Sequence, residues 1–110
     1  MNEIRSMGRK ATAAIADVSD LSAVQSMVQH SVSELGPLNT MIANAGIAQV
    51  KALLDLTEQD VRRMFEVNVF GVYNCYRAAA EAMIKQGTGG KIIGAARCVK
   101  WLFNCYRYLG

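Results

Sequence analysis

Three largely apolar runs alternate with two helical patterns, and this order restricts the fold more than any other feature of the chain. The runs cover residues 11–16, 38–43 and 91–96, and charged, polar, glycine or proline residues bound each of them. Runs of this length between turn signals are typical of buried strands. Because helices separate the runs, we expect parallel strands joined by right-handed crossovers. The sequence therefore predicts an α/β chain built on a parallel sheet.

The first helical pattern lies between the first two runs. Ser19 or Asp20 can cap its start, and Gly36 with Pro37 marks its end. Apolar residues recur between these limits at spacings of three and four, on one stripe: Leu21, Val24, Val28, Val32 and Leu35. We predict one amphipathic helix here.

The second helical pattern is longer and covers residues 58–85. Thr57 and Asp60 form a capping-box pattern at its start. Its apolar residues cover more than one face, and a helix of this kind packs on several sides, in a core or against another subunit. A short helix is also predicted over residues 1–7, and a loop with one helical turn over residues 47–55.

Composition narrows the class of protein. The 110 residues are 52% hydrophobic and 19% charged, which suffices for one globular core. A net charge of +3 without a clustered basic face does not indicate a nucleic-acid partner, and no apolar run reaches membrane-spanning length. The three cysteines lack paired spacing and there is one histidine, so neither a disulfide framework nor a metal site is predicted. We expect a cytoplasmic protein.

Polar residues follow the first two runs, where a parallel sheet binds its ligands. Asp17 closes the first run, and its carboxylate can accept a hydrogen bond from an exocyclic amine while Val18 packs on a flat ring. Alternatively, Asp17 only begins the turn before the helix. Asn44, Ala45 and Gly46 close the second run, either as a turn that approaches a ligand or as an ordinary turn.

Asn68 stands inside the long apolar helix, where asparagine is a poor helix former. Its amide is expected to be partly buried and therefore needs hydrogen-bond partners. One interpretation is a bond to neighbouring backbone. The other is a functional one, in which the helix is kinked or a water is held near a reaction centre.

Taken together, four motifs between residues 3 and 96 resemble the short-chain dehydrogenase/reductase family. They occur in the family's order and spacing, as Ala16-Asp17-Val18, Ala43-Asn44-Ala45-Gly46, Val67-Asn68-Val69-Phe70-Gly71 and Gly89-Gly90-Lys91-Ile92-Ile93. The resemblance implies a partial Rossmann-like doubly wound parallel sheet, holding strands three to five with their helices, in a three-layer fold if complete. Residues 1–96 would be the central part of an NAD(P)-binding domain, and residues 97–110 a divergent, non-native tail.

The resemblance also implies roles for single residues. Asp17 and Val18 would contact the adenine of NAD or NADP. Asn44, Ala45 and Gly46 would stabilise the central sheet beside the cofactor. Asn68 would be the asparagine of the catalytic tetrad, which holds a water in the proton relay. The long helix would build a homo-oligomer interface.

Two departures from the family pattern affect the expected activity. No Gly-rich turn precedes Asp17, and Arg97 stands where the family has its serine, with no Y-x-x-x-K after it. We therefore expect an oxidoreductase by resemblance that is inactive as this chain, with a small ketone, diketone or alcohol as the family's substrate. Residues 47–50 and 74–76 look like the diacetyl and acetoin reductases. The alternative is a non-catalytic truncated paralogue that acts through helix-mediated association.

Topology adds one expectation about the first run. In the doubly wound order 3-2-1-4-5-6, strands one and two lie between strands three and four. A strand at residues 11–16 would then lack its neighbour, leaving a gap or an exposed edge.

Overall fold

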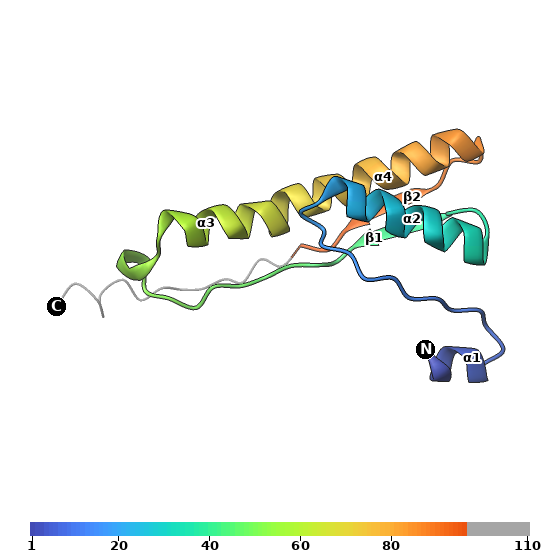
Figure 1. Ribbon diagram of the computed structural model, residues 1–110, viewed down its shortest axis with the longest axis horizontal. Coiled ribbons are helices and arrows are strands. Elements are labelled where there is room, and N and C mark those ends of the chain that lie inside the picture. The colour runs from blue at the N-terminus through green and yellow to red at the C-terminus, as the bar shows by residue number, and fades with distance from the viewer. Residues whose placement is uncertain (97–110) are drawn as a thin grey trace.

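The computed structural model of the chain describes residues 1–96. Two short parallel strands lie beneath one long helical course, and a second helix packs beside it (Figure 1). Arg97 and the predicted tail at residues 97–110 lie outside the described residues. Within the described part, no helix is both long and apolar enough to cross a membrane.

The first two helices follow the sequence prediction closely. Helix α1 covers Asn2–Ser6 and α2 covers Leu21–Leu35. Asp20, rather than Ser19, is the cap of α2, because its carboxylate accepts hydrogen bonds from the backbone N–H groups of Ser22 and Ala23. The cap fixes where the chain leaves the preceding turn.

The long helical course is interrupted, unlike the single helix predicted over residues 58–85. A 3-10 turn, η1 (Leu53–Asp55), precedes α3 (Glu58–Phe65), which the predicted capping box opens. A π-helical segment, η2 (Glu66–Phe70), then leads directly into α4 (Gly71–Gln86). A π-helical turn holds more residues than an α-helical turn, so η2 changes which side chains α4 turns toward the sheet. Asn68 lies in this segment.

The sheet consists of β1 (Thr40–Ala43) and β2 (Lys91–Gly94), which pair in parallel. Thr40 lies opposite Lys91 and Ala43 lies opposite Gly94. Each strand is shorter than the run that predicted it. Their parallel pairing agrees with the predicted crossover through the long helix.

The predicted strand at residues 11–16 is wrong, because this segment pairs with no strand of the described chain. It is a single extended stretch that leads from α1 to α2 (Figure 1), and Ile15 in it is fully exposed. A strand needs a neighbour for its backbone hydrogen bonds, and none lies alongside. The expectation that this segment would lack a neighbouring strand is therefore confirmed for the described residues.

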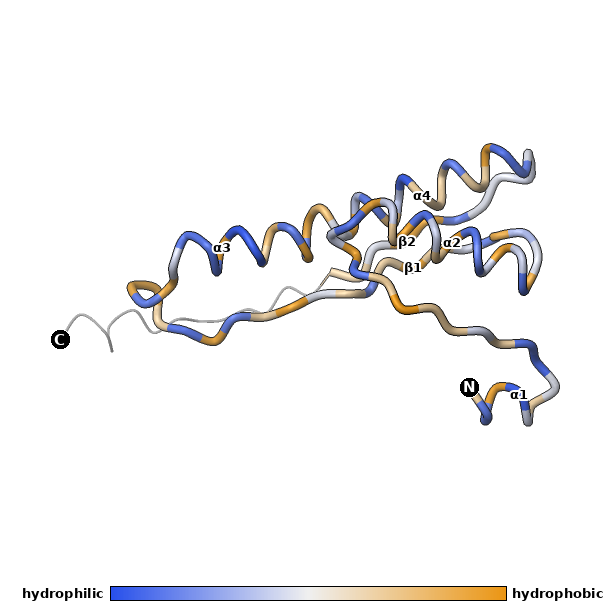
Figure 2. Tube along the Cα trace, viewed as in Figure 1, coloured by the Kyte–Doolittle hydropathy of each residue, from blue (hydrophilic) through white to orange (hydrophobic). Residues whose placement is uncertain are grey.

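The core lies between α2, α4 and β1. Its buried members are small or β-branched, namely Val24, Val28, Ala43, Cys75 and Ala78. Hydrophobic and hydrophilic residues alternate along both helices (Figure 2). The core covers only part of the apolar surface of α4, because Tyr73 and Ile84 are exposed. This packing holds α4 against β1 and so fixes the position of η2 above the loop that follows β1.

Candidate functional site

Asn68 joins the π-helical segment to the loop after β1. Its Oδ1 accepts a hydrogen bond from the Ile47 backbone N–H at 2.8 Å, and its Nδ2 donates to the Ile47 carbonyl at 2.8 Å. The amide thus pairs with one residue's backbone on both sides, as a neighbouring strand would. Gly46 lies so close that an added Cβ would come within 3.2 Å of Asn68 Oδ1. The structure therefore brings Asn68 to the predicted turn at residues 44–46.

The amide of Asn68 keeps part of its hydrogen-bonding capacity. A side-chain amide has two N–H donors and two acceptor lone pairs on oxygen. Ile47 uses one donor and one lone pair, so one donor and one lone pair remain. Asn68 is half-buried, which leaves these groups accessible to a small molecule such as water.

Asp17 forms a tight turn with Ser19. The backbone N–H and the hydroxyl of Ser19 both donate to Asp17 Oδ1, at 2.9 and 2.6 Å. These bonds, the hydroxyl's first, hold the pKa of the Asp17 carboxyl below its usual value, and the nearby Arg63 guanidinium adds a smaller effect. Arg63 Nη2 lies 3.5 Å from Asp17 Oδ2. The carboxylate is exposed and ionised, and can accept a hydrogen bond from an amine.

Val18 is held against the start of α4 by two contacts. Asn74 Nδ2 donates to the Val18 carbonyl at 2.8 Å. Gly71 faces the Val18 side chain so closely that a Cβ on Gly71 would lie 2.6 Å from Val18 Cγ2. The turn at Asp17 and Val18 therefore packs directly on the helix backbone at Gly71, an approach that a side chain at this position would block.

Sequence reasoning missed Asn74 as a site residue. The available signal was the one that identified Asn68, an asparagine inside an apolar helix. Asn68, Gly71 and Asn74 follow one another at intervals of three, so each is a neighbour of the next on the helix surface. The same helical course therefore contacts both polar segments that the sequence singled out. No hydrogen bond joins Asp17 or Val18 directly to residues 44–46 in the described part of the chain.

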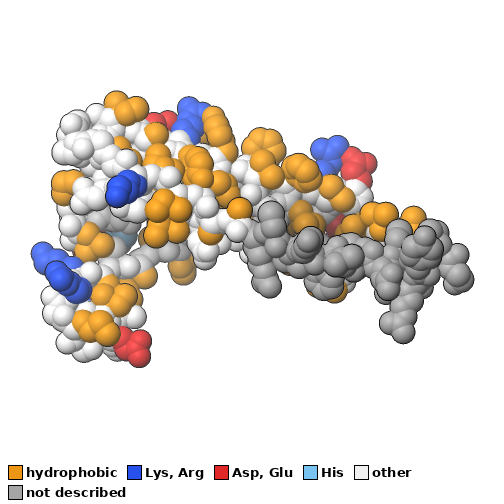
Figure 3. Space-filling view, turned by 180° about the vertical axis from the view of Figure 1, so that it is seen from behind, with side chains coloured by type: hydrophobic (Ala, Val, Ile, Leu, Met, Phe, Trp, Pro, Cys, Tyr) orange, Lys and Arg blue, Asp and Glu red, His pale blue; other side chains and the backbone are white. Residues whose placement is uncertain are grey.

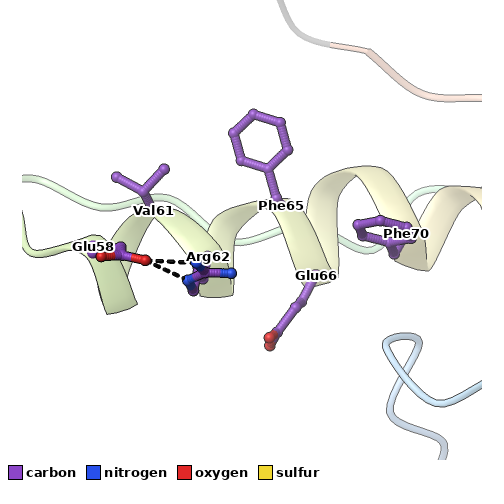
Figure 4. A pocket seen from close by; sticks show the side chains of 6 residues that line it. All are labelled: Glu58, Val61, Arg62, Phe65, Glu66 and Phe70. Atoms are coloured by element: carbon purple, nitrogen blue, oxygen red, sulfur yellow. Dashed lines mark hydrogen bonds and ion pairs between the residues drawn. The ribbon is translucent and has the colours of Figure 1, made fainter.

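Two surface depressions lie elsewhere, along α3. One, of about 430 Å³, is lined by side chains of α3 and η2 that include the Glu58–Arg62 ion pair and Phe65 (Figure 4). Another, of about 470 Å³, has a polar lining that includes Gln49, Asp60 and Arg63. Neither contains a predicted site residue, so the candidate site is defined by the two turns and the part of the helical course that joins them.

Comparison with known proteins identifies the family. The sequence model described as short chain dehydrogenase matches residues 1–96. The chain belongs to the short-chain dehydrogenase/reductase family. Members of this family are NAD(P)-dependent oxidoreductases that act on small molecules. The partial Rossmann-like fold and the family resemblance predicted from the sequence are therefore confirmed.

Curated relatives of the chain include enzymes with different substrates. It is 44% identical over 92 residues to a short-chain dehydrogenase/reductase of Armillaria gallica, covering 84% of this chain and 35% of that protein. It is 38% identical over 94 residues to an L-rhamnose 1-dehydrogenase (NAD(P)(+)) of Sphingomonas, covering 86% and 37%. A diacetyl reductase [(S)-acetoin forming] of Staphylococcus epidermidis is 39% identical over 93 residues, covering 84% and 36%. The chain spans little more than a third of the length of these relatives.

Solved structures agree with this placement. A short-chain type dehydrogenase/reductase from Mycobacterium marinum superposes with a TM-score of 0.81 at 39% identity, covering 86% of this chain and 37% of that one. A short-chain dehydrogenase from Burkholderia cenocepacia, solved in complex with NADP, gives 0.79 at 35% identity, covering 88% and 38%.

Proposed function

We propose that this chain supplies the central part of an NAD(P)-dependent site that interconverts a small ketone or diketone with its alcohol. The observation that supports this most is the two-sided bond between Asn68 and Ile47. It unites the family's N-A-G turn with the asparagine that the resemblance assigns to the catalytic tetrad. A diacetyl- or acetoin-like substrate is the specific proposal, supported by the similarity to a diacetyl reductase.

The residues around the two turns fit a dinucleotide. NAD(P)H would supply the hydride. Ala45 and Gly46 leave space beside the cofactor because neither has a large side chain, and Gly46 is already close to Asn68. The ionised carboxylate of Asp17 would accept a hydrogen bond from the adenine amine, and Val18 would pack on the ring. Asn68 would hold a water with its remaining donor, as part of a proton relay.

Hydride transfer also needs a proton donor at the carbonyl oxygen. Within residues 1–96, the two tyrosines are Tyr73 and Tyr76, and neither has a lysine four residues later. We therefore propose that this chain binds the nucleotide weakly and does not turn over substrate by itself. Its apolar long helix, η2 included, is further proposed to associate with a second copy.

Titration of the ¹⁵N-labelled chain with NADPH tests the proposed binding. We expect amide resonances of residues 17–19 and 44–47 to shift, and the shifts to weaken in Asp17→Ala and Asn68→Ala. Asp55→Ala is the matched control, because Asp55 is an exposed aspartate in η1. Shifts that are absent, or that respond equally to Asp55→Ala, would contradict the proposed site.

A separate assay tests turnover. The purified chain is incubated with NADPH or NADH and a panel of carbonyl compounds that includes diacetyl, and oxidation of the cofactor is followed by absorbance. We expect no rate above background. Robust oxidation would show that this chain contains a proton donor we have not assigned.

A further inference from the structure

Asn74 is the one polar side chain that residues 1–96 bury, with 7% of its surface exposed. A buried amide without a partner costs stability, so it needs a hydrogen bond. The bond it makes reaches 56 residues back along the sequence, to the Val18 carbonyl at 2.8 Å. Because this hydrogen bond joins a buried helical residue to a turn that is distant in sequence, it fixes the position of the turn.

The turn is fixed from two directions. Asn74 holds the peptide group that follows Val18, and the absence of a side chain at Gly71 allows the Val18 side chain to settle on the helix. Asp17 immediately precedes Val18, so the orientation of its carboxylate depends on the same anchorage. Without the bond from Asn74, the turn would keep its apolar contact with Gly71 in α4 and the contacts of Arg63 in α3 with Asp17 and Ser19.

The same helical course also holds the other turn. Asn68, six positions before Asn74, is bonded to Ile47. Ile47 directly follows Gly46, the last residue of that turn. A helix is rigid along its axis, so the two asparagines set a constant separation between the two polar segments. A dinucleotide that reaches from one turn to the other needs such a constant separation.

We infer that Asn74 is a positioning residue for an adenine nucleotide, acting through the Asp17–Val18 turn that it ties to the helix of Asn68. This inference rests on the proposed function. The residue does not touch the nucleotide. It holds the adenine contact at a fixed place relative to the Asn44–Gly46 turn.

Asn74→Ala tests the inference, with AMP and nicotinamide mononucleotide as probes in amide titrations of the full chain. We expect the affinity for AMP to fall about tenfold, the effect of losing one net hydrogen bond. The affinity for nicotinamide mononucleotide should stay within about twofold, because the Asn68–Ile47 pair is intact. Asn74→Ser, which keeps a shorter donor, should give an intermediate loss for AMP and serves if the alanine variant does not fold.

Gln86→Ala is the matched control on the same helix. Gln86 Oε1 accepts from the Leu38 N–H at 2.8 Å and its Nε2 donates to the Leu38 carbonyl at 3.1 Å, at the far end of α4. Its loss should lower stability without changing either affinity. Equal effects of the Asn74 and Gln86 variants on AMP, or no effect of the Asn74 variants, would overturn the positioning role. If the unaltered chain binds neither probe, the proposed function itself fails and the inference falls with it.

Discussion

At the scale of single residues, two asparagine side chains supply hydrogen bonds to loop backbone that no strand pairs with in the described chain. Replacing Asn68 with alanine removes both bonds to Ile47, and we expect the free energy of unfolding to fall by about 1–3 kcal/mol. Urea denaturation measures this. Asn39→Ala is the control, because Asn39 is an exposed asparagine just before β1. A loss no larger than in the control would mean that the Asn68 bonds contribute nothing to stability.

Asp17 provides a prediction about pH. Ser19 lowers the pKa of its carboxyl in the folded chain, so the group stabilises the fold above the usual value of 3.8. This contribution is lost as the pH falls through the lowered folded pKa. In Ser19→Ala the pKa should rise back toward 3.8, which a carboxyl-carbon NMR titration detects. The pKa of Asp20 is also lowered, chiefly by the Ser22 hydroxyl, and in the Ser19 variant it should change less than that of Asp17, because Asp20 senses Ser19 only through the charge on Asp17.

The two asparagines also show what can be predicted from single residues. Asn68 is recognisable in the sequence because it interrupts an apolar helix, and its expected burial predicted that its amide needs hydrogen-bond partners. Its partner, Ile47, could not be predicted, because the π-helical segment η2 decides toward which neighbouring segment the Asn68 side chain points. Asn74 carried the same signal, yet its partner Val18 is distant in sequence, and only the folded arrangement joins them.

At the scale of elements, Gly71 determines how closely the turn before α2 can approach α4. Alanine at a helix position usually stabilises by about 1 kcal/mol relative to glycine. Here the added Cβ would lie 2.6 Å from Val18 Cγ2, and overpacking of this kind costs about 1–3 kcal/mol. We therefore expect Gly71→Ala to lower the free energy of unfolding. Val18→Ala in the same chain should restore part of the loss, and a simple sum of the two single effects would contradict a direct contact.

The segment at residues 11–16 illustrates how a correct pattern can predict an element that does not form. The apolar run and the closing Asp17 are typical of a strand, but a strand also requires a neighbour. The apolar run and its end at Asp17 could therefore be read from the sequence, but whether a neighbouring strand pairs with it could not.

Hydrogen exchange tests this directly. The amides of residues 12–16 donate to no backbone acceptor of the described chain, so we expect them to exchange at nearly the unprotected rate. Amides in the middle of α4 should be slowed, as should those of Met41 and Ala43 in β1, whose N–H groups point toward β2 in this parallel register. Protection of residues 12–16 comparable to that of β1 would show that a strand does pair with them.

At the scale of the whole molecule, the order of elements was predictable because each crossover helix carries its own apolar stripe and caps. The caps by Asp20 and Thr57 and the glycine after α4 act locally, so their effects can be read from neighbouring residues. The site was predictable only as a set of residues. Its geometry depends on contacts between segments that are far apart in sequence, and on the π-helical segment, which Asn68 as a poor helix former does not specify by itself.

The described surface leaves many hydrophobic side chains exposed (Figure 3), and the long helix carries several of them. Val61 and Phe65 project from the same side of α3 (Figure 4) and are 41% and 56% exposed. Burying apolar surface stabilises association by roughly 25 cal/mol per Å². If a second copy covers this side, the chain should associate as its concentration rises.

Sedimentation equilibrium checks this expectation. The double variant Val61→Ser/Phe65→Ser removes apolar surface that association would bury, and we expect its dissociation constant to rise at least about tenfold, which corresponds to about 1.4 kcal/mol. Leu54→Ser is the matched control, because Leu54 is 95% exposed and lies in η1, outside the long helix. A chain that stays monomeric at all concentrations would contradict association through the helix. An equal effect of the Leu54 variant would instead indicate non-specific contact between apolar surfaces.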